Sequence, residues 1–411
     1  MPIKGPLPPA MDPEQSWNPR DWVNRGGELL ASDPYLAQQF LVQALRGIPE
    51  EPVAYYNLGI GLHQQRRLNA AIRAYRIALA LPGCPIKEAT NNLSQDLLLS
   101  GHWLEGWEHY EQRFQRRPEM QDFFKEHLGP RWPGPSQGEP GQHLVLVAEQ
   151  GLGDTLQFCR LALVLQELGH TITLFCQTAL VPLLQESSAL GQVVVDRLDP
   201  PDLIPGCRWV PLMSLTPLLL PDPQRIPYAS GYLRPDPQRV AAWGERLQRR
   251  PHRRLIALHW QGNPGHEGSL YSRGRSMAFS DWLGLRDLED VEFLSIQKCA
   301  GSEQLRLDAG LPFVAGQATF SASMDFRDTA AALAHCDLLL SADSGVVHLA
   351  GALGLPAWVA LRWIPEWRWG LEGCSTPWYG SLRLFRQPQD NDWASVVKAM
   401  ASELRHGALK S

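Results

Sequence analysis

From residue 143 onward the chain alternates short apolar runs with helical stretches, and this alternation limits the possible folds more than any other feature. The runs predict two sets of four strands: HLVLVA, TITLFC, QVVVD and CRWVPL, then RLIALHW, VEFLSIQ, DLLLSAD and AWVALR. Strands that alternate with helices form parallel sheets with helices on both faces. We therefore predict two doubly wound α/β domains, residues 143–235 and 236–411, that face each other across a cleft.

Residues 33–117 repeat a helical pattern with a period of 34 residues. Three pairs of positions carry the period: Ala37 and Ala71, Leu41 and Tyr75, Ala44 and Ala78. This period is typical of tetratricopeptide (TPR) repeats, and a generic array of helical hairpins is the alternative. We expect residues 1–32 to form a loosely ordered tail and residues 118–142, rich in proline and glycine, to form a linker.

The composition excludes several classes of protein. A net charge of −5 gives no basic field, so no nucleic-acid partner is expected. No apolar run approaches the length of about 18 residues that a membrane span needs, and the N-terminus lacks the apolar stretch of a signal peptide. The seven cysteines are scattered and include no CxxC pair, which argues against a disulfide framework or a structural zinc site. These features predict a cytoplasmic protein.

The stretch SADSGVVHLAGALGLPAWVAL, residues 341–361, places polar side chains between two apolar segments. Asp343, Ser344 and Gly345 fall on the turn between a strand and a helix, where free backbone N–H groups bind anions such as phosphate. His348 lies one helical turn further, on the side of Ser344. His348 is therefore either a ligand contact or a satisfied core histidine.

A glycine loop, VAEQGLGDTLQF, follows the first predicted strand. Gly151 and Gly153 permit a tight turn into the next helix, whose N–H groups offer a second anion site. The motif lacks the third glycine of the dinucleotide fingerprint, because Leu156 occupies that position. Asp154 has two interpretations: a helix cap and a general base that faces the cleft.

Two more loops follow predicted strands and carry cations. The loop HWQGNPGHEGSLYSRGRSM contains Asn263, Arg273 and Arg275, and the arginines are either clamps for a diphosphate or solvated surface groups. The strand end LSIQKCAG contributes Gln297 and Lys298. A fifth stretch, WRWGLEGCSTPWYGSLRLFRQ, either shapes a sugar or base pocket or caps the core. No Walker A, HExxH or GxSxG motif and no Cys/His metal spacing occurs, so no metal site is predicted.

In their order along the chain, these five stretches resemble the TPR-containing glycosyltransferase-like proteins of bacteria, over residues 35–390 or so. Those proteins are similar to the ADP-heptose:lipopolysaccharide heptosyltransferase superfamily and, more distantly, to O-GlcNAc transferase. The resemblance implies a GT-B fold, which is two Rossmann-like domains with the active site between them. It also implies that the C-terminal domain binds most of the nucleotide-sugar donor and that catalysis generally needs no metal.

The resemblance carries over to individual residues. Asp154 matches the aspartate proposed as base in the heptosyltransferase "GD" loop. Asp343, Ser344, Gly345 and His348 match the "DTGxxHL" donor-binding turn, with serine in place of threonine.

Other positions depart from the pattern of the family. Arg275 stands where a lysine contacts the donor, and Gln297 stands where those enzymes have a glutamate near the ribose. His259 stands where the TPR relatives carry a small or apolar residue, and the loop EGSLYSRGRSM that follows it is longer than expected.

We expect a glycosyltransferase that moves a sugar from a nucleotide-diphosphate sugar to an acceptor hydroxyl, with no cofactor beyond that donor. Inversion at the sugar is implied by the resemblance alone. The TPR region is expected to recruit an acceptor protein or glycan, or a partner. A non-catalytic TPR adaptor with a degenerate GT-B domain is one alternative, and an epimerase-like enzyme that acts on the donor alone is another. The sequence leaves open the sugar, the base, the acceptor and the oligomeric state.

Overall fold

A computed structural model describes residues 18–116, 118–197, 206–220, 225–323 and 325–407. The chain divides into two compact units: unit 1 is residues 1–118 with 366–371, and unit 2 is residues 119–365 with 372–411. Among the described residues, no helix is both long enough and apolar enough to cross a membrane. All seven cysteines carry free thiols, as expected for a chain without a disulfide framework.

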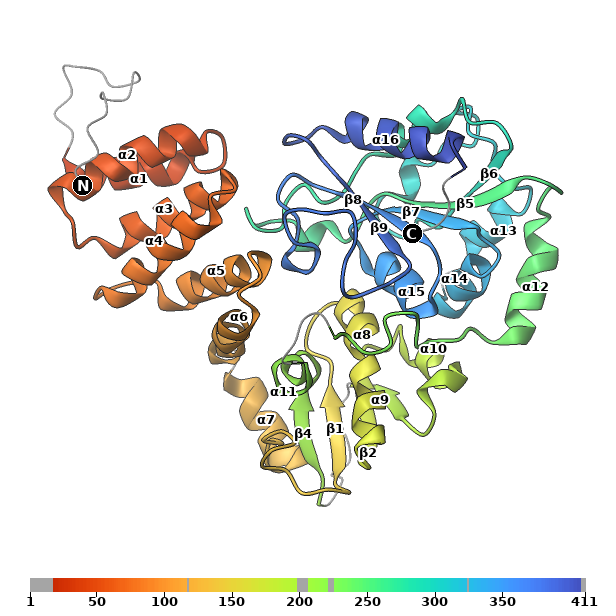
Figure 1. The fold of residues 1–411 in the computed structure, drawn as a ribbon, viewed down its shortest axis with the longest axis horizontal. Coiled ribbons are helices and arrows are strands. Elements are labelled where there is room, and N and C mark those ends of the chain that lie inside the picture. Colours follow the sequence, from red (N-terminus) through yellow and green to blue (C-terminus); the bar gives the residue numbers. More distant parts are fainter. Residues whose placement is uncertain (1–17, 117, 198–205, 221–224, 324, 408–411) are drawn as a thin grey trace. The chain divides into compact units, whose positions relative to one another are not determined.

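Unit 1 is built from helical hairpins, in which α1 packs on α2, α3 on α4 and α5 on α6 (Figure 1). The helices are α1 (Pro19–Leu29), α2 (Pro34–Gly47), α3 (Pro52–Gln64), α4 (Leu68–Ala80), α5 (Ile86–Leu99) and α6 (Trp103–Tyr110). The six side chains that define the period of 34 residues are all fully buried, with 0% exposure. The period in the sequence is therefore a period of core packing between successive hairpins.

Glycines allow the paired helices of unit 1 to pack closely against each other. A Cβ atom added to Gly59 would lie 2.4 Å from Cε1 of Tyr75, and one added to Gly26 would lie 2.6 Å from Cγ of Leu41. Leu41 and Tyr75 are the same position in two repeats. The chain thus builds one contact twice, with a large apolar residue of the second helix seated on a glycine of the first.

Helix α1 corrects the prediction of a loosely ordered tail over residues 1–32, which is wrong for Pro19–Leu29. The Asn18 side chain accepts hydrogen bonds from the backbone N–H groups of Arg20 (2.9 Å) and Asp21 (3.2 Å), and Asp21 accepts one from the backbone of Asn18 (3.0 Å). This reciprocal cap and Pro19 at the first helical position start the helix despite the glycines nearby. Residues 1–17 of the predicted tail lie outside the described residues.

The first sheet of unit 2 has four parallel strands in the order β3-β2-β1-β4. The strands are β1 (His143–Val147), β2 (Thr171–Cys176), β3 (Val194–Arg197) and β4 (Arg208–Pro211). The helices of this part are α8 (Leu152–Phe158), α9 (Arg160–Glu167), α10 (Val181–Glu186) and α11 (Leu215–Leu219). All four strands are those that the sequence predicts.

Helix α7 (Pro118–Leu128) replaces part of the predicted linker over residues 118–142, so that prediction is wrong for these residues. Phe124 and Leu128 are buried against the first sheet, in a cluster with Val145 and Trp209. Burial of this apolar pair stabilises a helix in a segment whose flanking prolines and glycines had suggested a linker.

The second sheet has five parallel strands in the order β6-β5-β7-β8-β9. The strands are β5 (Arg254–His259), β6 (Val291–Ser295), β7 (Leu338–Ala342), β8 (Ala357–Leu361) and β9 (Leu382–Arg386). The helices are α12 (Pro237–Leu247), α13 (Gln317–Ala322), α14 (Phe326–Leu333), α15 (Gly345–Leu353) and α16 (Trp393–Arg405). The prediction of two parallel-sheet domains of GT-B type after a helical region is confirmed. Of the strands in the described residues, β9 alone was not predicted, because its arginines interrupt the apolar pattern.

The aromatic stretch before β9 is divided between the two units. Residues 366–371 belong to unit 1, where the Trp367 ring lies edge-on to Trp107 at a centroid distance of 5.2 Å. Nη2 of Arg66 donates a hydrogen bond to the Leu371 carbonyl (3.0 Å). For this part of the stretch, capping a core is the interpretation that the structure supports.

Replacement of Gly59 by alanine tests the packing of unit 1. We expect Gly59→Ala to lower the free energy of unfolding by about 1–3 kcal/mol, because the new methyl group overlaps the buried Tyr75 ring. Gly61 lies in the same helix, and a Cβ there would approach no atom closer than 3.4 Å. Gly61→Ala should therefore be neutral or stabilising by up to about 1 kcal/mol. Urea denaturation followed by circular dichroism measures both, and equal effects of the two variants would contradict the packing argument.

Candidate functional site

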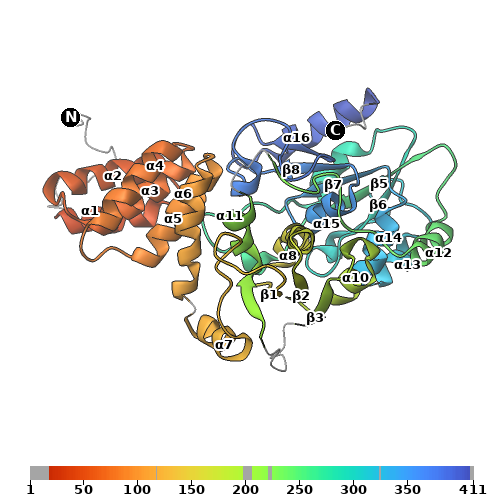
Figure 2. The same cartoon turned by 60° about the horizontal axis from the view of Figure 1, so that its bottom comes forward.

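Helices α8 and α15 begin beside each other in unit 2, each directly after a strand of its own sheet (Figures 1 and 2). A Cβ added to Gly153 would lie 3.3 Å from Cα of Gly345 and 2.8 Å from Cδ2 of His348. Glycine is thus required at 153 for the two helix starts to approach this closely. We call this place the α8–α15 junction, defined by Gly151, Gly153, Gly345 and His348.

Asp154 acts as a helix cap. Its Oδ2 accepts a hydrogen bond from the backbone N–H of Gly151 at 2.9 Å, which closes the first turn of α8. The side chain is partly exposed. Asp154 thus caps α8 from the third residue of the helix and not from the predicted N-cap position, which Gly151 occupies. Its role as a general base stays a prediction.

Ser344 precedes the first residue of α15, yet its hydroxyl makes no capping bond to that helix. Ser344 Oγ lies 3.2 Å from Nδ1 of His259 and 3.4 Å from Oγ of Ser341, and all three side chains are buried. Burial lowers the pKa of His259 to about 4, so its imidazole is neutral near pH 7. The buried imidazole of His259 therefore holds the Ser344 hydroxyl.

The Ser344–His259 bond has a consequence for α15. Ser344, the residue before its first turn, gives that turn no side-chain cap, so the Ser344 hydroxyl does not occupy the backbone N–H groups there. Uncapped N–H groups at a helix start, with the positive end of the helix dipole, favour an anion. Asp343 is buried beside this turn, at 8% exposure.

His348 is braced by a residue that the sequence argument did not single out. The Tyr379 hydroxyl lies 3.0 Å from Nδ1 of His348, and both side chains are buried. Tyr379 lies three residues before β9, in the aromatic stretch WRWGLEGCSTPWYGSLRLFRQ. Its place in that stretch was the only sequence signal for a role at the site. The braced histidine still borders Gly153 through Cδ2, so the structure gives His348 both a partner and a place at the junction.

The predicted loop after β5 lies at the carboxyl edge of the second sheet. Nε of Arg275 is 3.4 Å from Glu267, and its guanidinium borders Gly262. Asn263 is exposed and accepts a hydrogen bond from the N–H of Gly265 at 2.9 Å, which closes a local turn.

Arg362, at the end of β8, fastens this loop and was missed by the sequence argument. Its guanidinium donates to the backbone carbonyls of Arg273 (2.8 Å) and Tyr271. The signal available was an arginine directly after a predicted buried strand, at the edge where ligands bind in parallel sheets.

Gln297 and Lys298 brace their own domain. Gln297 is buried, accepts from the N–H groups of Trp260 and Gln261 (3.0 Å each) and donates to the carbonyls of Gln261 (2.8 Å) and Ala300 (2.7 Å). Nζ of Lys298 donates to the Phe320 carbonyl, and burial lowers its pKa to about 8. These bonds tie the end of β6 to its neighbours. A contact of either side chain with a donor stays a prediction.

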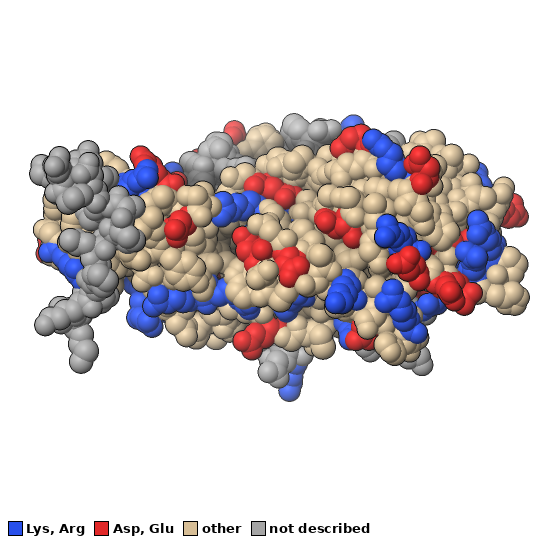
Figure 3. Space-filling model, turned by 90° about the horizontal axis from the view of Figure 1, so that it is seen from above, with Lys and Arg blue, Asp and Glu red and all other residues tan. Residues whose placement is uncertain are grey.

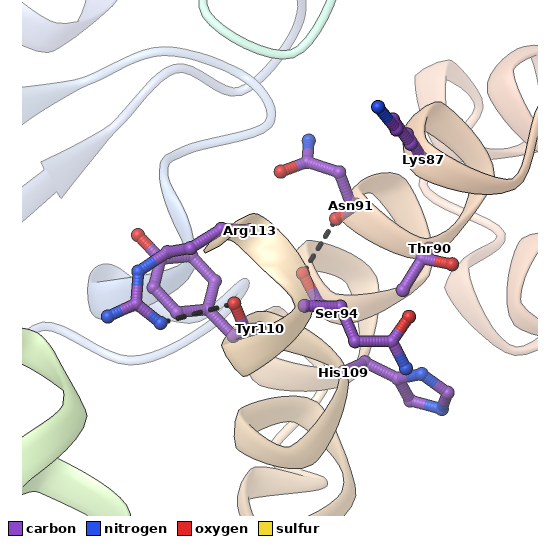
Figure 4. Close-up of a pocket in the computed structure, with 8 residues that line it drawn as sticks. Lys87, Thr90, Asn91, Ser94, His109, Tyr110 and Arg113 are labelled. Atoms are coloured by element: carbon purple, nitrogen blue, oxygen red, sulfur yellow. Dashed lines mark hydrogen bonds between the residues drawn. The ribbon is translucent and has the colours of Figure 1, made fainter. Parts of the chain in front are cut away.

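A polar pocket lies in unit 1, on α5, α6 and the short helix that follows them (Figure 4). Arg113 lies with its guanidinium over the Tyr110 ring, 4.6 Å from the centroid, and donates to the Tyr110 carbonyl at 3.2 Å. The lining residues are Lys87, Thr90, Asn91, Ser94, His109, Tyr110, Gln112 and Arg113. The pocket is lined by hydroxyl, amide and basic groups.

Part of the second sheet domain matches a known protein family in sequence. Residues 298–361 match the profile of Glycosyltransferase family 9 (heptosyltransferase). The matched segment runs from Lys298 to the end of β8 and includes the whole of α15. Over these residues, the match confirms the predicted resemblance to the heptosyltransferase superfamily.

One curated relative matches nearly the whole chain. It is Protein FlbA of Caulobacter vibrioides, 27% identical over 389 residues, which are 89% of this chain and 63% of that protein. The chain thus spans less than two thirds of the length of this relative.

Solved structures with similar folds include glycosyltransferases. A glycosyl transferase family 9 structure from Veillonella parvula covers 67% of this chain and 93% of its own, at 13% identity and a TM-score of 0.45. Heptosyltransferase II of E. coli covers 64% and 98%, at 14% identity and a TM-score of 0.40. An O-GlcNAc transferase mutant from Thermobaculum terrenum covers 96% and 92%, at 11% identity and a TM-score of 0.24. These scores are low, so the fold class rests on the strand order of this chain.

The neutral His259 predicts a pH dependence of stability. Its folded pKa of about 4 lies below the ordinary 6.5, so between these values the unfolded chain binds a proton that the folded chain does not. Stability should therefore fall as the pH drops through this window. We expect the wild type to lose about 2 kcal/mol more than His259→Asn between pH 7 and pH 5.

Urea denaturation at the two pH values measures this loss. The asparagine amide keeps a polar group for Ser344 and removes the titration. His252→Asn, at an exposed histidine, is the control and should keep the wild-type dependence on pH. A wild type and a His259→Asn protein with the same dependence would refute the buried neutral imidazole.

Proposed function

We propose that the protein is a glycosyltransferase that moves a sugar from a nucleotide-diphosphate sugar to an acceptor hydroxyl. The observation that carries the proposal is the match of residues 298–361 to Glycosyltransferase family 9. The matched segment contains the uncapped start of α15, which meets the glycine turn of α8. The proposed donor site on one sheet domain would therefore adjoin the candidate base on the other.

The donor diphosphate would bind at the first turn of α15. Acidic and basic side chains are interspersed on the face shown in Figure 3, so an anionic ligand depends on local donors. Backbone N–H groups after Ser344 supply those donors, and Arg275 adds a cation at the neighbouring strand end. Fixed dipoles and charges of this kind stabilise the negative charge that develops on the departing diphosphate. No cofactor other than the donor is part of the proposal.

Asp154 is the proposed general base. A carboxylate accepts about four hydrogen bonds, so the bond from Gly151 orients the side chain and permits another from an acceptor hydroxyl. Asp154 and the diphosphate site lie on different helices, α8 and α15. Attack from the side opposite the leaving group suits this placement and gives inversion at the sugar carbon.

Unit 1 is the proposed recruiter of the acceptor. The pocket on α5 and α6 offers hydroxyl, amide and basic side chains, which suit the polar groups of a polypeptide or a glycan. We also place the reaction in the cytoplasm, because free thiols such as those of all seven cysteines persist in a reducing compartment.

Donor binding and transfer test the proposal together. UDP, GDP and ADP, with and without an attached sugar, are screened by thermal shift. A ligand at 100 times its dissociation constant stabilises the folded state by about 2.7 kcal/mol. With the donor that binds, Asp154→Asn should lower the transfer rate by about 10²–10⁴-fold and leave donor affinity within about twofold, because only proton transfer is lost.

Asp308→Asn is the matched control, because Asp308 is exposed in the same unit, and it should transfer at the wild-type rate. A chain that binds none of the nucleotides, with Asp154→Asn indistinguishable from wild type in every assay, would instead be the TPR adaptor. Turnover of the donor without an acceptor would point to an epimerase-like enzyme.

A further inference from the structure

Arg160, the first residue of α9, is a fully buried cation. Its guanidinium donates to the Trp378 carbonyl at 2.8 Å and to the Tyr232 hydroxyl at 3.1 Å, and its Nε donates to the Gln157 carbonyl at 2.8 Å. Burial lowers the pKa of Arg160, but Tyr232 and the nearby Tyr379 more than offset this, so the net pKa lies above the ordinary value. A permanent charge at such a place is costly unless its partners are well arranged.

The guanidinium of Arg160 also lies against two aromatic rings. Its central carbon is 4.4 Å from the ring centroid of Tyr232 and 4.6 Å from that of Tyr379. The Tyr379 ring also packs directly on α15. A Cβ added to Gly351 of this helix would lie 2.3 Å from Cδ1 of Tyr379. Arg160 from the first sheet domain and Gly351 from the second thus fix the position of one tyrosine.

Tyr379 in turn contacts His348, with 3.0 Å between the hydroxyl and Nδ1. A neutral imidazole carries its proton on one nitrogen, and the bond made by the other nitrogen selects which. Phenol is a better donor than an imidazole N–H, and an imidazole nitrogen is a better acceptor than a phenol oxygen. The cation over the Tyr379 ring strengthens the phenol further as a donor. The expected bond therefore runs from the Tyr379 O–H to Nδ1.

The Tyr232 hydroxyl is a competing acceptor for the Tyr379 proton. The Tyr232 hydroxyl interacts with Tyr379, but it already accepts from Arg160 and donates to the Leu156 carbonyl at 2.6 Å. The imidazole of His348 is the stronger acceptor of the two.

The other edge of the His348 imidazole, away from Nδ1, borders Gly153. A Cβ added to Gly153 would lie 2.8 Å from Cδ2 and 3.6 Å from Nε2 of His348.

We propose that Arg160 and Tyr379 are positioning residues that hold His348 as the neutral tautomer with its proton on Nε2, at the α8–α15 junction. This rests on the proposed function only for the ligand: the Nε2–H group donates a hydrogen bond to a phosphate oxygen of the donor. The tautomer itself is a property of the protein alone.

The first experiment reads the tautomer directly. Long-range ¹H–¹⁵N spectra of the full-length protein labelled on histidine nitrogens distinguish Nε2–H from Nδ1–H, and His348→Gln assigns the signal. The wild type should show Nε2–H. Tyr379→Phe should give a mixture of both tautomers, since only the hydroxyl is removed. Tyr228→Phe removes a hydroxyl that donates to Glu167 and should leave the signal of His348 unchanged.

A proton on Nδ1 in the wild type, or an unchanged signal in Tyr379→Phe, would overturn the proposal. Substitution of Arg160 risks the fold, so Gly351→Ala serves as a second variant, whose new methyl group displaces the Tyr379 ring without removing a polar group. It should also yield a mixture of tautomers. If it fails to fold, the wild-type and Tyr379→Phe spectra still decide.

The second experiment measures binding of inorganic pyrophosphate and of UDP, GDP and ADP by calorimetry. For any of these that the wild type binds, Tyr379→Phe should weaken the affinity by about tenfold and Tyr228→Phe should not. Equal affinities in the wild type and Tyr379→Phe would refute the positioning role in binding. The two proposals can fail separately. A His348 proton on Nε2 without nucleotide binding would refute the proposed glycosyltransferase activity. Nucleotide binding with the His348 proton on Nδ1 would refute the positioning role of Arg160 and Tyr379.

Discussion

The approach of Gly153 to Gly345 is the constraint on which the arrangement of unit 2 depends. The first turns of α8 and α15 come this close because Gly153 has no side chain: a Cβ there would lie 3.3 Å from Cα of Gly345, whereas a Cβ on Gly345 would lie no closer than 3.5 Å to Gly153. A methyl group on Gly153 would meet both the backbone of Gly345 and the ring of His348. The two sheet domains therefore meet at the carboxyl ends of β1 and β7, where parallel sheets place their ligands.

Side chains around this contact are arranged to leave the backbone of α15 available. Ser344 would ordinarily cap the helix, but its hydroxyl lies at 3.2 Å from the buried, neutral His259. His348 also lies near this turn, and its Nδ1 is held by the Tyr379 hydroxyl at 3.0 Å. Each polar side chain near the first turn thus has an interaction that directs it, and the helix start is preserved as a group of backbone donors.

The sequence predicts the strands and turns of unit 2 well, because short apolar runs and glycine turns are local patterns. It fails where local signals conflict. α1 and α7 begin among prolines and glycines that suggested disorder, and β9 carries arginines in an apolar run. Contacts such as that of Arg160 with the Trp378 carbonyl join residues 218 positions apart. No spacing rule in one sequence marks such a pair, so the partners of Tyr379 and Arg362 could be found only in the fold.

A site built on backbone donors also explains why its departures from the related pattern are compatible with one function. Serine in place of threonine at 344 changes a hydroxyl that is turned to His259, and glutamine at 297 binds the backbone of its own domain. Neither change removes an N–H group from the start of α15. Arg275 keeps a cation where a lysine would stand. In the proposed glycosyltransferase, the identity of these side chains would bear on which base and sugar are accepted, whereas diphosphate binding would depend on the main chain of α15 and on Gly153, which lets α8 approach it.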